Sequence, residues 1–301
     1  MNTKLSINNI VDWTITEDMV NNVKVDEVGV LDRVSSLATR SIKKESKLNA
    51  LQKIVSMCDL TTLEGEDTEG KIIQMSSKAI APDPNDESVP SAAAVCVYPA
   101  LVSTAKKTVK DSSVKVASVS SYFPSGQAPI ESKISDTKFA INEGADEIDI
   151  VINRKAFFEG DYKKVYEEIK SLKDVCGDIH LKTILEIGEL KTYENIKKAS
   201  VIALCAGSDF IKTSTGKISN GSSREACLVM ARTVREFQSY GYGMRGIKVA
   251  GGIRSSKDAI RYLVIINEEL GSSWLSPDYF RFGASSLLDA VSYTHLTLPT
   301  T

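Results

Sequence analysis

The sequence has no excess of charge of either sign and no long apolar run. Lysine and arginine total 37 against 39 aspartates and glutamates, a formal charge of −2 that gives no general field to attract nucleic acid or an anionic membrane. The longest apolar runs, at residues 92–97 and 201–207, are far too short to cross a bilayer, and residues 1–9 lack the apolar core of a signal peptide. We therefore expect a cytoplasmic protein without nucleic-acid or membrane partners.

Cysteine and histidine are also scarce. The five cysteines are odd in number, widely spaced and never arranged as C-x-x-C, which predicts reduced, mostly buried thiols. Histidine occurs only as His180 and His295, with no cluster of cysteine or carboxylate ligands around either. We expect no metal and no cofactor, so that side chains alone carry the chemistry.

What the chain does contain is a regular alternation of two patterns. Short stretches rich in β-branched and apolar residues predict eight strands, at 55–61, 92–99, 114–123, 147–152, 180–187, 209–215, 246–252 and 279–285. Apolar spacing of three or four residues predicts helices between them, at 68–80, 100–111, 134–144, 162–176, 192–207, 224–240 and 256–270. Parallel strands need such crossovers, so we predict an α/β fold with a single closed, eight-stranded parallel (β/α)8 TIM barrel. The alternative is a doubly wound open sheet, but no G-x-G-x-x-G follows the first strand.

The barrel accounts for most of the 301 residues. We predict an N-terminal helical extension packed on the barrel at 1–50 and the barrel domain at 51–290, because no linker rich in Pro, Gly or Ser separates them. The last residues, 291–301, read VSYTHLTLPTT and resemble neither a barrel helix nor a charged tail. We expect this tail to be atypical, and either foreign or truncated.

Charged residues lie within several predicted strands, and barrels of this kind build their active sites where strands end. Asp149, Lys182, Lys212 and Lys248 occur in EIDIVI, HLKTIL, DFIKTST and GIKVAGG. A lone buried charge is unfavourable, whereas several together offset one another. Each residue taken alone is equally well explained as part of a structural ion pair, but the four together favour a functional site.

The two lysines on the sixth and seventh strands suggest amine chemistry. A lysine attacks a carbonyl only when uncharged, and with an ordinary pKa of about 10.4 very little free amine exists at neutral pH. A like charge about 4 Å away supplies about 4 kcal/mol at an effective dielectric constant near 20, enough to lower that pKa by about three. We therefore predict Lys212 as nucleophile, Lys248 as its activator and Asp149 as the residue that moves protons.

Glycine-rich turns follow the last three predicted strands. STGK at 214–217, AGG at 250–252 and GASS at 283–286 would place backbone N–H groups and hydroxyls around one spot at the barrel mouth. Barrels frequently bind phosphate with these loops. Any one such stretch is most often only a tight turn, but three in consecutive loops predict a phosphate site.

With these residues in place, the chain closely resembles the deoxyribose-phosphate aldolase family over about residues 50–290. The matching stretches include DLTTL, AAVCVYP, GADEIDIVIN, LKTILEIGEL, AGSDFIKTSTGK, K-x-AGGIR and FRFGASSLL. The resemblance implies a class I, Schiff-base-forming aldolase that reversibly cleaves 2-deoxy-D-ribose 5-phosphate to D-glyceraldehyde 3-phosphate and acetaldehyde in deoxyribonucleotide catabolism. It implies small-molecule sugar phosphate and aldehyde substrates, and it leaves the oligomeric state open, a homo-oligomer included.

The resemblance also implies roles for individual residues. Lys212 would form the Schiff base, Lys248 would lower its pKa and Asp149 would assist proton transfer. Asp59, Thr61 and Lys182 would support the pocket. Substrate binding, with the phosphate foremost, would fall to Thr215, Gly216, Lys217, Gly251, Gly252, Ser285 and Ser286.

Two departures from the family pattern stand out. Val249 occupies a position where the family usually has Pro, a change expected to affect loop stiffness more than chemistry. Some members end in a tyrosine that completes the site, whereas this tail offers only Tyr293 in an unrelated context. Two rival functions stay open, namely another Schiff-base barrel such as a keto-acid or transaldolase-like enzyme, and a barrel that binds a sugar phosphate without turnover.

Overall fold

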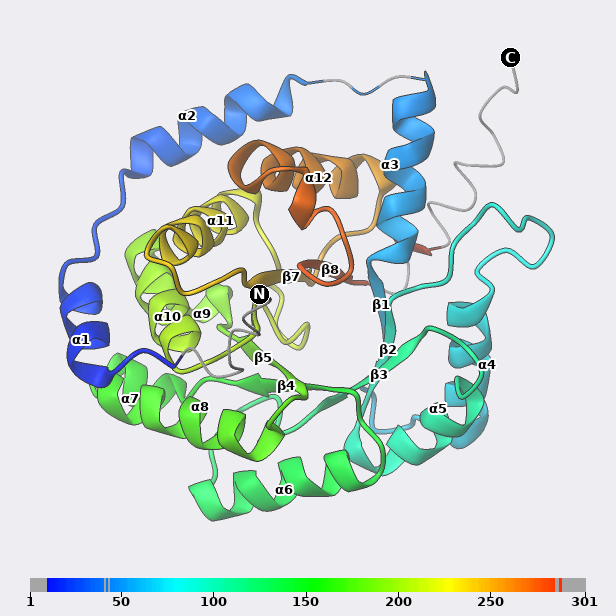
Figure 1. Cartoon of the computed structure of the whole chain (residues 1–301), viewed down its shortest axis with the longest axis horizontal. Helices are drawn as coiled ribbons and strands as arrows, with labels where there is room; N and C mark the ends of the chain where they lie inside the picture. The colour runs from blue at the N-terminus through cyan, green and yellow to red at the C-terminus, as the bar shows by residue number, and fades with distance from the viewer. Residues whose placement is uncertain (1–9, 41, 43, 285–286, 289–301) are drawn as a thin grey trace, which may run out of the picture.

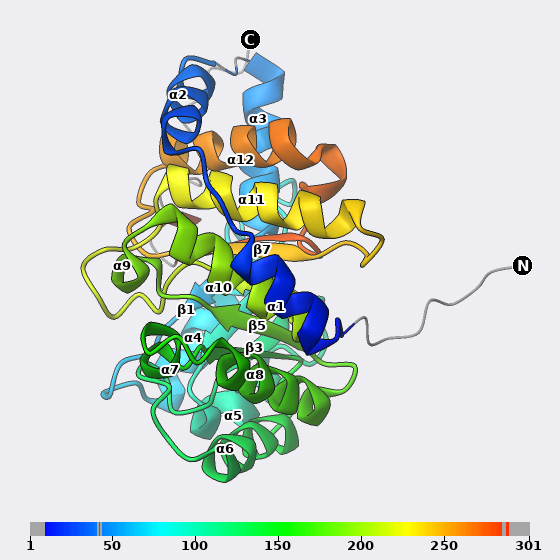
Figure 2. The ribbon, with the colours of Figure 1, turned by 90° about the vertical axis from the view of Figure 1, so that its left-hand side faces the viewer.

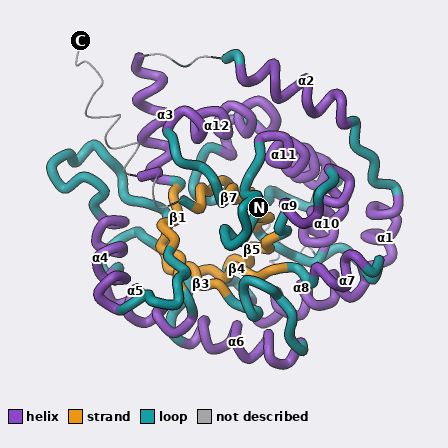
Figure 3. Tube along the Cα trace, turned by 180° about the vertical axis from the view of Figure 1, so that it is seen from behind, coloured by secondary structure: helices purple, strands orange, loops and turns teal. Residues whose placement is uncertain are grey.

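A computed structural model of the protein describes residues 10–40, 42, 44–284 and 287–288. In this part of the chain eight parallel strands pair in sequence order, and the eighth pairs with the first to close a barrel. The strands form a ring at the centre with helices around it (Figures 1 and 3). Their bounds are β1 Cys58–Thr61, β2 Ala94–Val97, β3 Lys115–Val119, β4 Glu147–Val151, β5 His180–Ile184, β6 Phe210–Lys212, β7 Gly246–Ala250 and β8 Phe280–Gly283.

This arrangement confirms the predicted TIM barrel, and the closing pair rules out the open sheet. Cys58 of β1 pairs with Phe282 of β8, so neither strand is an edge. Each observed strand lies within its predicted stretch, but all are shorter. The prediction that the first strand begins at residue 55 is wrong, because Val55 and Ser56 are the last residues of helix α3 (Lys44–Ser56). Most of the other predicted stretches run on into the loops at the barrel mouth.

The two faces of each strand differ in character. Outward-facing residues such as Ile148 and Ile247 are fully buried in a core shared with helix residues such as Ile169 and Val234. Because side chains alternate along a strand, the neighbours of these residues point into the barrel. There the charged residues of the predicted site are found.

Helices follow the strands and cover the barrel from outside (Figure 2). The predicted helices between the strands are all present. Their bounds are α4 Glu69–Ile80, α5 Val102–Thr108, α6 Ile130–Asn142, α8 Tyr162–Cys176, α10 Tyr193–Cys205, α11 Arg224–Ser239 and α12 Ser256–Leu270.

Two short helices were not predicted. Helix α7 (Arg154–Phe158) and helix α9 (Ile187–Leu190) occupy the loops after β4 and β5. The prediction that the fifth strand continues to residue 187 is wrong, since β5 ends at Ile184 and Glu186 has left-handed backbone angles, φ 60 and ψ 61. Single turns of helix carry too few residues to show a period in the sequence.

Three helices precede the barrel, α1 (Trp13–Asn21), α2 (Glu27–Ala38) and α3 (Lys44–Ser56). Helix α1 lies against α8 and α10, where the Trp13 ring meets the ring of Tyr166 with centroids 5.4 Å apart. Helix α2 lies outside α11 and α12, and α3 packs beside α12 (Figure 1). The tail expected at 291–301 lies outside the described residues. Among the residues that are described, no helix is long and apolar enough to span a membrane.

Candidate active site

The interior of the barrel is charged on the side formed by β4 to β8. Lys212 pairs in register with Lys248 on the neighbouring strand, and Asp149 pairs with Lys182, so each pair points to the same face. All four side chains are buried. Closure of the barrel therefore brings together the four charged residues that the sequence singled out.

Asp149 is the centre of this group. Its Oδ2 atom lies 2.8 Å from Nζ of Lys212 and 3.0 Å from Nζ of Lys248, and its Oδ1 atom lies 3.0 Å from Nζ of Lys182. Because both Lys212 and Lys248 contact the same oxygen, their nitrogens lie within about 6 Å of each other, close enough for substantial repulsion.

A second layer of ion pairs supports the first. Nζ of Lys248 also lies 2.6 Å from Oδ2 of Asp59, and Lys182 is 2.5 Å from Oε2 of Glu147. Arg281 of β8 joins both carboxylates, at 2.7 Å from Asp59 and 2.8 Å from Glu147. Thr61 lies at the end of β1, where its hydroxyl donates to the carbonyl of Asp59 at 3.1 Å.

The buried interior holds one more cation than carboxylates among the described residues. Its four cationic side chains are Lys182, Lys212, Lys248 and Arg281, and its three carboxylates are Asp59, Glu147 and Asp149. An unbalanced charge in a low-dielectric interior is unfavourable. If Lys212 is the uncharged member, the interior is neutral.

The pKa values of Lys212 and Lys248 are shifted in opposite directions, which also makes Lys212 the amine that loses its proton more readily. Burial lowers the pKa of Lys212 below its ordinary value and the charge of Lys248 adds to this, whereas Asp149 opposes it. Burial would also lower the pKa of Lys248, but Asp149 and Asp59 together raise it above its ordinary value. The sequence predicts that Lys248 lowers the pKa of Lys212, whereas in the structure burial is the larger cause of the lowering.

Asp149 itself stays ionised. Burial alone would raise its pKa, but Lys182, Lys212 and Lys248 hold that pKa well below the ordinary range. The carboxylate therefore accepts hydrogen bonds from all three ammonium or amine groups and is a weak base on its own.

Beyond Lys115, whose Nζ lies 3.6 Å from Oε1 of Glu147, the interior face of β2 and β3 is apolar. Cys96, Ala117 and Val119 form a buried cluster with Leu63, and the rings of Tyr98 and Phe123 pack against it. A cavity of about 150 Å³ opens beside these rings, lined by Tyr98, Pro99, Val119, Ser120, Tyr122, Phe123 and Asp136. The site thus has a charged wall and an apolar wall.

The loops predicted to bind phosphate lie beside one another. Ser222, in the loop after β6, donates its N–H to the carbonyls of Ala250 and Gly251, at 3.1 and 3.0 Å. A side chain at Gly221 would approach Gly251 to 2.5 Å, so the close contact of the two loops requires glycine there. Gly216 and Gly252 have φ of 80° each and open space where a Cβ would be.

The remaining predicted binding residues differ in their surroundings. Lys217 is partly exposed, and its Nζ lies 2.8 Å from Oε1 of Glu64 in the loop after β1. Thr215 is buried, with its hydroxyl donated to Glu186. Ser285 and Ser286 lie outside the described residues.

Several charged residues of the site were missed from the sequence, namely Glu147, Arg281, Glu186 and Arg154. Glu147 stands two residues before Asp149, so the alternation that places Asp149 inside the barrel would have placed Glu147 there too. Arg281 lies between Phe280 and Phe282 and had the same signal. Glu186 and Arg154 had none, because their positions depend on loop conformation.

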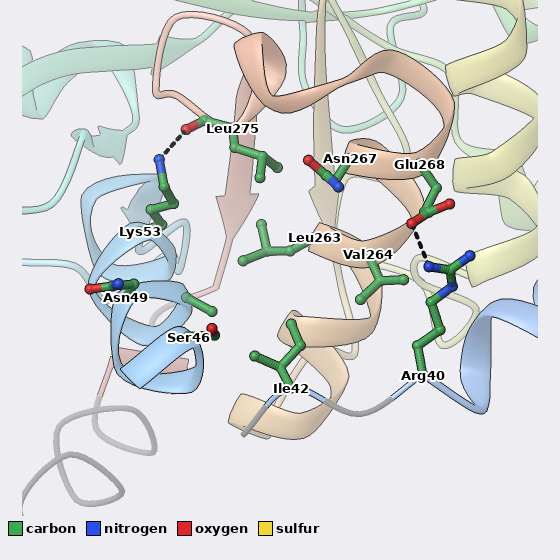
Figure 4. Close-up of a pocket in the computed structure, with 11 residues that line it drawn as sticks. Arg40, Ile42, Ser46, Asn49, Lys53, Leu263, Val264, Asn267, Glu268 and Leu275 are labelled. Carbon is green, nitrogen blue, oxygen red and sulfur yellow. Dashed lines mark hydrogen bonds and ion pairs between the residues drawn. The ribbon is translucent and has the colours of Figure 1, made fainter. Parts of the chain in front are cut away.

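A larger cavity, of about 490 Å³, lies in the outer layer between α3 and α12 (Figure 4). Its side chains are already engaged, since Arg40 lies 2.8 Å from Glu268 and Lys53 donates to the carbonyl of Leu275 at 3.2 Å. None of its lining residues is a predicted site residue. Within the described ranges, no group of three or more His, Cys, Asp or Glu is arranged to hold a metal ion.

Comparison with known proteins agrees with this geometry. A model of the DeoC/LacD family aldolases matches residues 53–292. Deoxyribose-phosphate aldolase of Homo sapiens is 42% identical over 293 residues, 92% of either chain, and that of Mus musculus is 41% identical with the same coverage. The solved structure of QR15, an aldolase, superposes with a TM-score of 0.67 at 29% identity, covering 82% of this chain and 99% of QR15. The chain therefore belongs to the DeoC/LacD family of aldolases, enzymes of the lyase class.

Proposed function

We propose that this aldolase cleaves 2-deoxy-D-ribose 5-phosphate reversibly to D-glyceraldehyde 3-phosphate and acetaldehyde, through a Schiff base on Lys212. The substrate is proposed from the names of the most similar relatives and from the glycine-rich loops beside the site. The Schiff base is proposed from the lysines themselves.

One observation carries the proposal. In the described part of the chain Lys212 forms an ion pair with one carboxylate, Asp149, whereas Lys248 forms two, with Asp149 and Asp59. The proton is therefore held more tightly on Lys248, and Lys212 is the amine that more readily loses it. A buried uncharged amine at the end of a barrel strand is a nucleophile for a carbonyl carbon.

In the proposed cleavage Lys212 attacks C1 of the open-chain aldehyde, and loss of water leaves an iminium. Asp149 acts through a water molecule to take the proton of the C3 hydroxyl. The C3–O electrons form the carbonyl of glyceraldehyde 3-phosphate while the C2–C3 bond breaks. The electron pair of that bond passes to C2, and the iminium accepts it as an enamine.

Release of the second product reverses the first steps. A proton returned to C2 converts the enamine to the iminium of acetaldehyde, and addition of water frees acetaldehyde and restores the amine of Lys212. Lys248 stays protonated throughout, held between Asp149 and Asp59. Lys182 fixes the other oxygen of Asp149, and Asp59, followed on β1 by Thr61, holds Lys248 from the other side.

We assign the phosphate to the loops after β6, β7 and β8. Gly216, Gly251 and Gly252 let the backbone approach the phosphate without steric hindrance, and Lys217 supplies a positive charge. Thr215 would act through the loop that it holds, and Ser285 and Ser286 are included from the family resemblance alone.

The cellular compartment and the domain limits of the enzyme are part of the same proposal. All five cysteines are buried and free, which supports a reducing, cytosolic compartment. We also propose that residues 1–50 are an extension of a barrel domain at 51–290, limits that lie close to the family match at 53–292. The chemistry proposed requires neither a metal nor a cofactor.

Borohydride trapping tests the central step. Incubation with acetaldehyde and sodium borohydride should leave an ethyl group on Lys212, found by mass spectrometry of its peptide. Lys212→Met should lose both the adduct and acetaldehyde release, whereas Lys155→Met, on a side chain 69% exposed, should retain both. A stable adduct formed by the Lys212→Met variant would refute the assignment.

The substrate is tested separately. Acetaldehyde release from 2-deoxyribose 5-phosphate, followed with a coupled alcohol dehydrogenase, should survive dialysis against a chelator. An adduct on Lys212 without this release would favour a different Schiff-base barrel. Absence of both would favour a barrel that only binds its ligand.

A further inference from the structure

Glu186 is a buried carboxylate for which the proposed reaction has no use. It follows β5 and precedes α9, and its side chain is fully buried. Its φ of 60° is uncommon for a residue with a side chain and unfavourable by about 1 kcal/mol. A strained backbone and a buried charge at one position are retained where surrounding contacts require them.

Those contacts lead directly to the loop that follows the proposed nucleophile. The hydroxyl of Thr215 donates a short hydrogen bond to Oε2 of Glu186, and the N–H of Thr215 lies 3.4 Å from either carboxylate oxygen. The same hydroxyl accepts the N–H of Lys217 at 3.1 Å. Glu186 thus connects through one side chain to both ends of the turn at Gly216.

On its other side Glu186 is connected to a second loop of the barrel mouth. Nη1 of Arg154 lies 3.5 Å from Oε2 of Glu186, and Nη2 of Arg154 donates to the carbonyls of Pro124 and Ser125 at 3.1 Å each. The adjacent N–H of Ile187 donates to the carbonyl of Thr213 at 3.0 Å. The carboxylate therefore lies between the loop after β3 and the loop after β6.

Burial raises the pKa of Glu186, and the hydrogen bonds of Thr215 and the charge of Arg154 partly offset this rise. Contacts from both loops therefore counteract the effect of burial on this carboxylate.

We propose that Glu186 is a positioning residue that, through Thr215, holds the turn at Gly216 and Lys217 in the conformation that receives the phosphate. It would thereby set the preference of the enzyme for phosphorylated over unphosphorylated sugars. This inference rests on the proposed function, since it assigns the phosphate to that turn. Glu186 touches no reacting atom and acts only on the loop.

A purely structural role makes a different prediction. If Glu186 served only to stabilise the barrel, its loss would lower the activity of the enzyme equally on every substrate. If it positions the phosphate loop, its loss should raise KM for 2-deoxyribose 5-phosphate and leave the kinetics of 2-deoxyribose, which has no phosphate, unchanged.

The experiment compares kcat/KM for these two substrates in the wild-type protein and in Glu186→Gln. Loss of a hydrogen bond to a charged acceptor should lower kcat/KM for the phosphorylated sugar about tenfold, mainly through KM. Activity on 2-deoxyribose should stay within about twofold of wild type. Glu189→Gln is the matched control, because Glu189 also pairs with Arg154, at 3.3 Å, but its side chain is 43% exposed and forms no hydrogen bond or ion pair with the phosphate loop in the described structure. It should keep the wild-type preference.

Variants of Thr215 test the link from the other side and do not require the Glu186 variant to fold. Thr215→Val should reproduce the loss of preference, Thr215→Ser should restore it, and Glu186→Gln with Thr215→Val should do no more than either alone. Equal losses on both sugars, or an unchanged preference in both Glu186→Gln and Thr215→Val, would overturn the inference. A wild-type enzyme that does not prefer the phosphorylated sugar would instead refute the proposed phosphate site, and this inference with it.

Discussion

Replacing Lys248 by Met removes one positive charge from beside Lys212 at nearly constant side-chain volume. Nζ of Lys248 and Nζ of Lys212 lie 3.0 and 2.8 Å from the same oxygen of Asp149. A unit charge about 6 Å away contributes about 2.8 kcal/mol at an effective dielectric constant near 20, equivalent to about a hundredfold in the acid dissociation constant of Lys212.

The direction of the change in the pKa of Lys212 follows from the charge of its ammonium form. The ammonium of Lys212 is repelled by Lys248, so removing Lys248 favours the ammonium and raises the pKa of Lys212. Asp149 also loses one cation and becomes more available to Lys212, which acts in the same direction. At neutral pH the free amine, and with it the rate of adduct formation, should fall about a hundredfold.

The assay is the rate of borohydride-trapped adduct as a function of pH. In wild type the rate rises with the loss of the proton from Lys212 and then levels off. In Lys248→Met the rise should move to higher pH by about two, with a similar final rate. Lys248→Arg retains the charge and should leave the midpoint near that of wild type.

An unchanged midpoint in a folded Lys248→Met variant would refute this reasoning. Burial, which is the larger cause of the low pKa of Lys212, would then be sufficient by itself. Circular dichroism shows whether the variant is folded, and so distinguishes that result from a loss of structure.

Two further predictions concern stability. The pKa values of Asp149 and Asp59 are lowered in the folded state, so their stabilising contribution is present above their unfolded pKa of about 4 and is lost as the pH falls below it. Calorimetry should show the unfolding midpoint falling between about pH 5 and pH 3, and a constant midpoint would contradict the ion-pair account. Arg281→Met leaves Asp59 and Glu147 with one buried cationic partner each, Lys248 and Lys182, and should cost about 3–5 kcal/mol of unfolding free energy in a guanidinium chloride titration. Arg40→Met, on a side chain 53% exposed, should cost less than about 1 kcal/mol, and equal losses in the two variants would argue against the buried network.

The fold was predictable because its signals are local and repeated. The composition of stretches such as EIDIVI and GIKVAGG indicates buried strands, and the spacing of apolar residues predicts the helix that follows each strand. The left-handed conformation of Glu186 was not predictable, since no glycine or asparagine marks it and tertiary contacts impose it.

The site was predictable in part for a related reason. Asp149, Lys212 and Lys248 occupy interior positions of neighbouring or nearby strands, and barrel closure alone directs such residues to one place. Their partners were harder to assign. Asp59 of β1 meets Lys248 of β7 across the closing strand β8, a contact between residues 189 positions apart that no local pattern contains.

The sequence by itself determined the alternation of strands and helices, the residues that face the barrel interior and the two lysines capable of amine chemistry. It did so because strand periodicity fixes the face of each side chain without reference to distant residues. Only the tertiary structure supplies a physical reason to propose Lys212, rather than Lys248, as the nucleophile. That choice depends on how many carboxylates each amine contacts once the barrel closes, one for Lys212 and two for Lys248 in the described residues, and on the burial that closure imposes.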